Sequence, residues 1–176
     1  MVQAFTILRK KYLWSAELYL AGAKESDIRD ALRERQIRVE EVDWQKIHML
    51  GDLGSEKLTD YYNLCDVFCM PSYFEAYGLV FAEALTYGLP CIGRDKFAMS
   101  EFIEDGCTGR LISGEDAEEL ALDLWEVLQD PKYREEVERR REWYLREYSW
   151  DKVAQRICSV MEKNERDKDQ YRSAGV

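Results

Sequence analysis

The chain has 176 residues, of which 46% are hydrophobic and 34% charged, and its formal net charge is -10. This balance favours one folded domain with a hydrophobic core over a disordered polypeptide. The negative charge argues against nucleic-acid binding, which needs a basic face for the phosphate backbone. We find no apolar run of the roughly 20 residues needed to cross a membrane and no signal-peptide pattern, and therefore expect a soluble cytoplasmic protein.

The cysteines occur without a C-x-x-C pair, and His48 is the only histidine. A zinc site combines closely spaced cysteine and histidine ligands, so we expect no metal site. Cysteines within apolar runs usually act as small hydrophobic side chains, which favours reduced thiols. The five cysteines are Cys65, Cys69, Cys91, Cys107 and Cys158.

Short apolar runs alternate with amphipathic segments in the first two thirds of the sequence. In chain order we expect helix 2–12, strand 16–22, helix 25–37, strand 46–52, helix 55–65, strand 66–72, helix 77–88, strand 91–94, a short helix 98–105 and strand 109–113. Ser26 or Asp27 is the expected N-cap of the second helix, and Ser55 that of the third. Strands that read as continuous apolar runs between helices are typical of a Rossmann-like parallel sheet covered on both faces. The expected fold class is therefore α/β.

The rest of the sequence reads as helical. We expect helices over 116–130, from Pro131 onward, and over 149–164. The charged run KYREEVERRRE places opposite charges three and four residues apart, which favours a solvated helix face over a binding patch. The polar residues that follow are expected to fray. We thus expect one domain over 1–164 and a polar tail over 165–176.

One loop lies where an α/β protein binds its ligand. In open parallel sheets, ligands bind beyond the carboxyl ends of the strands, and the strand DVFCM ends at Met70. We expect Gly78 to open the next helix, because glycine lets a ligand approach the backbone closely. The amides of Gly78, Leu79 and Val80 would then be free donors at the positive end of a helix dipole. Such a site suits a phosphate group.

Two glutamates flank this helix start. Glu75 lies on the loop, and Glu83 lies within the helix, about 7.5 Å from Gly78 along its axis. A carboxylate only accepts hydrogen bonds, so it suits a ligand rich in hydroxyl groups. One acid on each side of a diphosphate indicates a nucleoside-diphosphate sugar. Two simpler roles stay open: Glu75 as a dipole or capping partner of the helix, and Glu83 as a surface residue.

The sequence DVFCMPSYFEAYGLVFAEALTYGLPCI (66–92), with SEFIEDGCTGRLI (100–112) after it, closely resembles the signature of retaining GT-B glycosyltransferases of family 4. That signature has an apolar strand, P-S, E-x-[FY]-G, a second glutamate after seven further residues, G-x-P, an acid-isoleucine element and D-G-x-x-G. The likeness covers most of the chain and implies the C-terminal, donor-binding half of a GT-B fold. The matching residues are Pro71, Ser72, Glu75, Tyr77, Gly78, Glu83, Gly88, Pro90, Glu101, Ile103, Asp105, Gly106 and Gly109.

The resemblance implies roles for these residues. Glu75 would face the donor sugar, Glu83 would bind the nucleotide ribose, and the Gly78–Val80 amides would meet the phosphates. Tyr77 belongs to the same substrate-binding loop. Retaining enzymes of this family keep the anomeric configuration of the sugar, commonly through a front-face route without a settled protein nucleophile. We therefore assign Glu75 to sugar positioning and charge stabilisation rather than to covalent attack.

Two further contacts are matched less closely. By the same resemblance, Gly51 and Asp52, in the loop after KIHML, would lie against the base. The Gly-Gly that normally precedes the acid-isoleucine element is absent, and RDKFAMSE stands in its place. Arg94 and Lys96 lie in that loop; we consider them substitute phosphate contacts, and ordinary surface positions are the alternative. The resemblance implies transfer without a metal ion.

The start of the sequence departs most from the family. The donor domain normally opens with a strand ending in G-R and a nearby lysine, which neutralise the departing diphosphate. This sequence opens within what would be the next helix, and Arg9, Lys10 and Lys11 lie too far along it to replace them. The absent strand would occupy the centre of the order 3-2-1-4-5-6, so we expect an open slot with unpaired backbone groups. We infer a fragment, a gene with a mis-set start, or half of a two-piece enzyme.

Three functions are weighed on this basis. The first is the donor-binding half of a retaining glycosyltransferase, incomplete alone, whose acceptor domain is either supplied by a separate chain or lost to a mis-set start. The second is a non-catalytic nucleotide-sugar-binding or partner module, favoured by the absence of the basic pair and the acceptor domain. A sugar-nucleotide epimerase is disfavoured, because the further acids that it needs are not found. Peripheral membrane association would involve the absent half, and the sugar, base and acceptor stay open.

Overall fold

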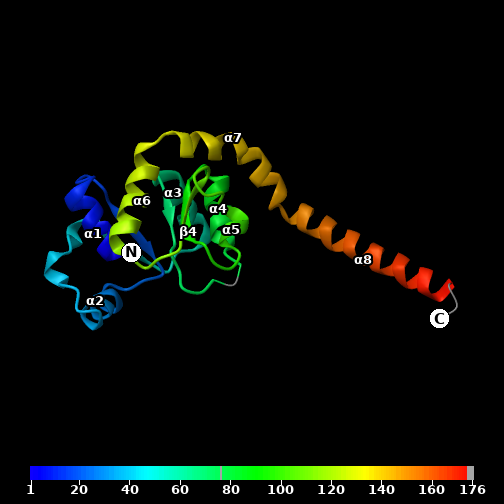
Figure 1. Ribbon diagram of the computed structural model, residues 1–176, viewed down its shortest axis with the longest axis horizontal. Helices are drawn as coiled ribbons and strands as arrows, with labels where there is room; N and C mark the ends of the chain where they lie inside the picture. The colour runs from blue at the N-terminus through cyan, green and yellow to red at the C-terminus, as the bar shows by residue number, and fades with distance from the viewer. Residues whose placement is uncertain (76, 174–176) are drawn as a thin grey trace.

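The computed structural model describes residues 1–75 and 77–173, with side chains described up to residue 163. Strands alternate with helices as far as β5, and helices follow to the end of the described chain (Figure 1). This pattern confirms the α/β class. In chain order the elements are α1 (Val2–Lys11), β1 (Leu18–Ala21), α2 (Glu25–Glu34), the 3₁₀ turns η1 (Val39–Glu41) and η2 (Trp44–Lys46), β2 (Ile47–Gly51), α3 (Ser55–Leu64), β3 (Phe68–Cys69), α4 (Leu79–Thr86), β4 (Cys91–Arg94), α5 (Met99–Phe102), β5 (Gly109–Ile112), α6 (Ala117–Gln129), α7 (Lys132–Glu147) and α8 (Trp150–Ser173).

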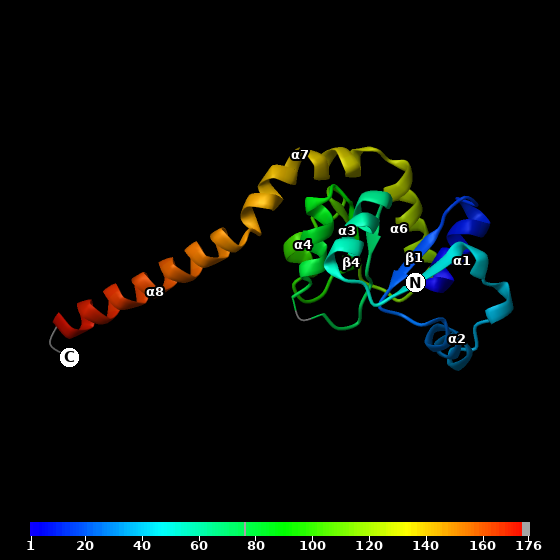
Figure 2. The ribbon, with the colours of Figure 1, turned by 180° about the vertical axis from the view of Figure 1, so that it is seen from behind.

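All strand pairs are parallel, but the strands form two sheets. β1 pairs with β2, starting with Leu18 opposite Ile47. In the second sheet β4 lies between β3 and β5. α1 and α6 lie on one side of β4, and α4 and α5 lie on the other (Figures 1 and 2). Helices therefore flank the parallel strands as expected, while strand pairing within the described residues is interrupted between β1 and β3.

The hydrophobic core is arranged around α1 and α4. The largest group of buried side chains packs α4 and α7 against the second sheet, and it includes Phe81 and Leu85. A second group places Leu8 of α1 with Ile112 of β5 and the buried face of α6. A third group covers the β1–β2 sheet and includes Phe5. Because α1 contributes to the second and third groups, it connects the two sheets.

Two expected helix caps are wrong. The N-cap of α2 is Lys24 rather than Ser26 or Asp27, and the N-cap of α3 is Gly54 rather than Ser55. Neither helix has a side-chain hydrogen bond at its cap. The N-cap position requires an extended backbone, which Lys24 and Gly54 adopt. Each helix therefore begins slightly before the polar residue that its sequence offered.

The expected strand over 66–72 is reduced to β3, because the N–H of Ser72, the next donor after Met70, turns back to the Met70 carbonyl oxygen at 2.9 Å instead of continuing the ladder. α8 is longer than expected: it extends to Ser173 through residues that were expected to fray. No glycine or proline interrupts that stretch. α8 projects away from the rest of the molecule (Figure 1), and Trp150 at its start is 86% exposed. None of the helices in the described chain combines the length and apolar character needed to cross a membrane.

Candidate functional site

The loop between β3 and α4 ends at a glycine that both backbone and packing require. Gly78 is the N-cap of α4 and has a left-handed backbone with φ of +83°. A Cβ atom at this position would lie 3.0 Å from the Phe81 ring and 3.3 Å from Cγ of Glu75. Glycine tolerates both the angle and the close approach. The expectation that α4 begins at Gly78 is therefore confirmed.

Three backbone donors at the start of α4 have no acceptor within residues 1–75 and 77–173. The carbonyl of Gly78 accepts a hydrogen bond from the Phe81 N–H at 2.9 Å. The N–H groups of Gly78, Leu79 and Val80 donate to no acceptor among the described residues. Such groups carry the positive partial charge of a helix amino end, and the Leu79 side chain beside them is exposed. This end of α4 can therefore bind an anion.

Glu75 and Tyr77 lie on the loop just before Gly78. Glu75 is half-buried, and its side chain packs against the Cα of Gly78. Tyr77 is exposed and meets Phe102 of α5 edge-on, with ring centroids 5.3 Å apart. The structure thus brings Glu75 to the amino end of α4 and packs the loop against α5.

Glu83 is exposed on α4 and is held by a tyrosine that the sequence analysis missed. The hydroxyl of Tyr62, on α3, donates to Oε2 of Glu83 at 3.3 Å. Burial, and then the charge of Glu83, raise the pKa of Tyr62 far above its usual value, so this phenol stays a donor. Its ring stacks on Tyr87 with centroids 5.3 Å apart. Glu83 is therefore an exposed carboxylate with a tyrosine donor beside it, and its ribose contact stays a prediction next to the alternative of a surface residue.

Gly51 and Asp52 lie at the carboxyl end of β2, in the other sheet. Gly51 has φ of +63°, and its carbonyl accepts a hydrogen bond from the Gly22 N–H at 2.8 Å. Asp52 is exposed. Within the described residues no hydrogen bond joins either residue to the loop before α4, so their contact with a base stays a prediction.

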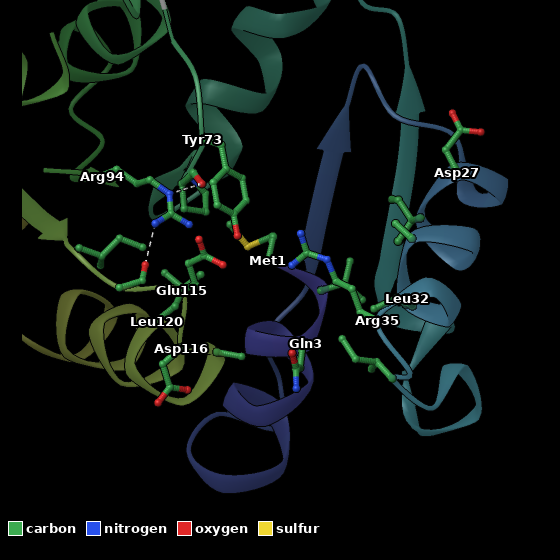
Figure 3. A pocket seen from close by; sticks show the side chains of 18 residues that line it. Met1, Gln3, Asp27, Leu32, Arg35, Tyr73, Arg94, Glu115, Asp116 and Leu120 are labelled. Carbon is green, nitrogen blue, oxygen red and sulfur yellow. Dashed lines mark hydrogen bonds between the residues drawn. The ribbon is translucent and has the colours of Figure 1, made fainter. Parts of the chain in front are cut away.

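Arg94 ends β4, and its side chain lies on the face of the second sheet opposite α4. Its side chain points toward a cavity of about 410 Å³ on the side of α1 and α6 (Figure 3). Its guanidinium donates to the carbonyl oxygens of Pro71, at 3.1 Å, and Gly114, at 2.7 Å. It also lies 4.4 Å from the ring centroid of Tyr73. Arg94 thus joins the loops that follow three strands, and a phosphate contact for it, or for exposed Lys96, stays a prediction.

The described residues contain no group of three or more histidine, cysteine or acidic side chains that could hold a metal ion. The cysteines Cys65, Cys69, Cys91, Cys107 and Cys158 are all free. Burial raises the pKa of Cys69 to about 12, so this thiol is protonated near neutral pH.

Comparison with known proteins supplies the family. The model of the family described as "Glycosyl transferases group 1" matches residues 1–144. The chain belongs to this family. A D-inositol 3-phosphate glycosyltransferase of Kribbella flavida is 32% identical to it over 98 residues, 56% of this chain and 23% of that protein.

Solved structures share the GT-B fold of this glycosyltransferase domain. Anabaena HepE, solved with UDP and glucose, matches with a TM-score of 0.74 at 18% identity, covering 92% of this chain and 44% of HepE. The pneumococcal O-GlcNAc transferase GtfA, solved with UDP and GlcNAc, matches with a TM-score of 0.68 at 24% identity, covering 91% of this chain and 32% of GtfA. The chain thus spans less than half the length of each of these three proteins.

Proposed function

We propose that this glycosyltransferase domain binds a nucleoside-diphosphate sugar at the amino end of α4 and serves retaining transfer of the sugar, as in family 4. The Gly78–Val80 amides would hold the diphosphate, Glu83 the ribose and Glu75 the sugar. The base would lie toward Gly51 and Asp52. The acceptor site would come from polypeptide outside residues 1–176, either on a separate chain or in a longer form of this one.

The observation that carries the proposal is the left-handed N-cap at Gly78. Three amides there donate to no acceptor among the residues that the structure describes, Glu75 lies beside them, and Tyr62 donates to Glu83 about one and a half turns further along the helix. An anion site between two hydroxyl-binding carboxylates matches the chemistry of a sugar nucleotide. The UDP bound to HepE and GtfA supports the same ligand class.

Thermal protection tests the donor. At millimolar concentration, one of the common uridine, guanosine or adenosine diphosphate sugars should raise the Tm of the isolated chain, because a ligand that binds only the folded state stabilises it. The free nucleoside diphosphate should protect as well. If none of these compounds changes Tm, the proposed donor site is wrong.

Two matched substitutions test the division of roles. Glu83→Gln should weaken nucleoside-diphosphate binding by about 1–3 kcal/mol, because a charged hydrogen bond to the ribose is lost. Glu75→Gln should instead reduce the preference for the sugar-bearing donor over the free diphosphate. Glu142→Gln, an exposed glutamate of α7, serves as the control and should leave titration calorimetry unchanged. Equal effects of the first two substitutions on both ligands would contradict the assignment.

A second candidate is a non-catalytic nucleotide-sugar-binding or partner module. The basic residues of α1 favour it for the isolated chain, because Arg9, Lys10 and Lys11 pair with Asp43, Glu41 and Glu118 rather than with the amino end of α4. An assay of sugar transfer separates the two candidates. Turnover by the chain alone, unaffected by EDTA, would eliminate the module and support metal-independent transfer.

A further inference from the structure

Two phenylalanines form an exposed pair beyond the carboxyl ends of the second sheet. Phe74 lies on the loop between β3 and α4, and Phe97 lies on the connection between β4 and α5. Their ring centroids are 5.5 Å apart and their planes meet at 70°, so the rings form a corner rather than a closed stack. Phe74 is 75% exposed and Phe97 is 52% exposed. Large apolar side chains that gather on a surface mark interaction sites, which makes this pair a candidate contact surface.

The backbone of Phe97 shows that its ring is held in place at a cost. Phe97 has φ of +56°, in the left-handed region that bulky side chains disfavour. Within the described residues, Gln36 is the only other non-glycine residue with a positive φ. A glycine would adopt this angle without strain. Strained residues cluster at functional sites, so a phenylalanine at this position favours a role for its side chain.

The loop that carries Phe74 is packed against the region from β4 to α5. The ring of Tyr73, the preceding residue, has its centroid 4.4 Å from the guanidinium carbon of Arg94 (Figure 3). Further along the loop, Tyr77 meets Phe102 of α5 with ring centroids 5.3 Å apart. These two contacts hold the loop, and with it the phenylalanine pair, against the β4–α5 connection.

The pair adjoins the proposed position of the donor sugar, because Glu75 follows Phe74 directly in the chain. The face of an aromatic ring carries negative partial charge. The C–H groups on one face of a sugar ring are polarised positively, so such a ring can lie on a phenylalanine while its hydroxyl groups bond to carboxylates. An anionic membrane surface fits less well, because the net charge of the chain is -10. The chemistry beside Glu75 therefore favours a sugar ring.

We propose that the acceptor of the transfer is a carbohydrate and that one of its sugar rings stacks on the pair of Phe74 and Phe97. The inference rests on the proposed function and adds the class of the acceptor. In the transfer, a hydroxyl oxygen of the acceptor bonds to the anomeric carbon of the donor sugar while the bond from that carbon to the diphosphate breaks. The diphosphate oxygen keeps the electron pair and takes up the hydroxyl proton. The two phenylalanines take no part in these bonds; they place the acceptor ring beside the sugar that Glu75 holds.

Saturation-transfer NMR with three neutral trisaccharides, maltotriose, cellotriose and triacetylchitotriose, tests the stacking. At millimolar concentration at least one of them should bind the parent chain. Phe97→Gly should raise its dissociation constant at least about fivefold, while Tm stays equal or rises because glycine relieves the left-handed strain. Phe97→Tyr keeps a flat ring and should keep the binding, whereas Phe97→Leu keeps an apolar side chain without a ring face and should lose it. Gln36→Gly, which relieves the same kind of strain outside the two loops, is the control and should bind like the parent chain.

The proposal is wrong if no trisaccharide binds the parent chain, or if Phe97→Gly and Gln36→Gly bind equally well. Two other results would assign the pair to a different partner and overturn it as well. One is cosedimentation of the parent chain with phosphatidylglycerol vesicles that Phe97→Gly abolishes, which indicates a membrane. The other is loss of thermal protection by UDP in Phe97→Gly, which indicates stacking on the base of the donor.

The donor is tested separately on the parent chain. Thermal protection by a nucleoside-diphosphate sugar without trisaccharide binding would overturn the carbohydrate acceptor alone. Trisaccharide binding that depends on Phe97, without protection by any donor, would overturn the proposed donor site alone.

Discussion

The two sheets differ in how deeply their strands are buried. Every residue of β4 is buried, whereas no residue of β1 is buried, and Ile47 is the one buried residue of β2. Helices pack on both sides of β4, and the buried groups led by Phe81 and Leu8 lie there. Local stability follows the density of buried apolar contacts. We therefore expect the β1–β2 sheet to open more readily than the second sheet.

The proposed donor site takes residues from both sheets. The loop with Glu75 and Gly78 leaves the well-packed sheet, at β3, whereas Gly51 and Asp52 end the less buried one. The groups proposed for the diphosphate and sugar thus follow the more deeply buried sheet. The groups proposed for the base follow the less buried sheet.

Replacing one glycine at each sheet by alanine should give the largest difference in lost stability. In Gly109→Ala, at the start of β5, the new Cβ would lie 1.8 Å from the backbone oxygen of Cys91, so the two strands must move apart. We expect a loss of about 3 kcal/mol or more in the free energy of unfolding, at the upper end of overpacking effects. Denaturant unfolding followed by circular dichroism measures it.

Gly22→Ala, just after β1, is the matched control. Gly22 has φ of +72°, but no other atom lies within 4 Å of the new Cβ. The cost should therefore be the left-handed backbone alone, about 1–2 kcal/mol. Equal losses for the two variants would show that the sheets are not packed differently at these positions.

Replacing one leucine at each sheet by alanine should give a smaller difference in lost stability. Leu85 of α4 is fully buried against the second sheet, and Leu85→Ala should cost about 2–5 kcal/mol, because a cavity remains. Leu20 of β1 is half-buried, so Leu20→Ala should cost about 1–2 kcal/mol. Chemical denaturation of both variants gives the comparison, and a larger loss at Leu20 would reverse the order of the two sheets.

Patterns between neighbouring residues predicted the elements of the fold. The apolar run CIGR coincides with β4, and Gly78 begins α4 as its conformational freedom suggested. These features depend on local backbone preferences and on burial of whole segments. The caps of α2 and α3 were wrong, because an extended backbone at the preceding residue was enough to begin each helix.

Contacts between distant residues could not be predicted. Tyr61 and Tyr62 are adjacent in the sequence, and Glu83 lies 21 residues after Tyr62. Which of the two tyrosines contacts Glu83 depends on the side of α3 from which each projects. Arg94 was considered a phosphate contact because its charge stood in the right loop. In the fold, its guanidinium also meets two backbone carbonyls whose positions depend on the ends of other strands, while its phosphate contact stays a prediction.

Acid should give the smallest difference in stability between the two sheets. Hydrogen bonds from Lys46, and then from His48, lower the pKa of Glu17, just before β1, to about 2. Because the folded pKa lies below the unfolded value near 4.5, this stabilisation is present above about pH 4.5 and is lost as the pH falls toward 2. Asp123 lies on α6, which packs on the second sheet. Burial raises the pKa of Asp123 despite its ion pair with Arg110, so protonation of Asp123 does not destabilise the fold.

Glu17→Gln tests this difference. The variant should be slightly less stable than the parent chain near neutral pH and should converge with it by about pH 2, because both then lack the charge. Salt should shrink the gap as well, since the pair is exposed. Denaturant unfolding as a function of pH measures the effect, with Glu142→Gln as the control for an exposed glutamate outside the sheet. A gap that does not change with pH would mean that Glu17 acts through packing, and the β1–β2 sheet would then have no acid-sensitive tie of its own at this position.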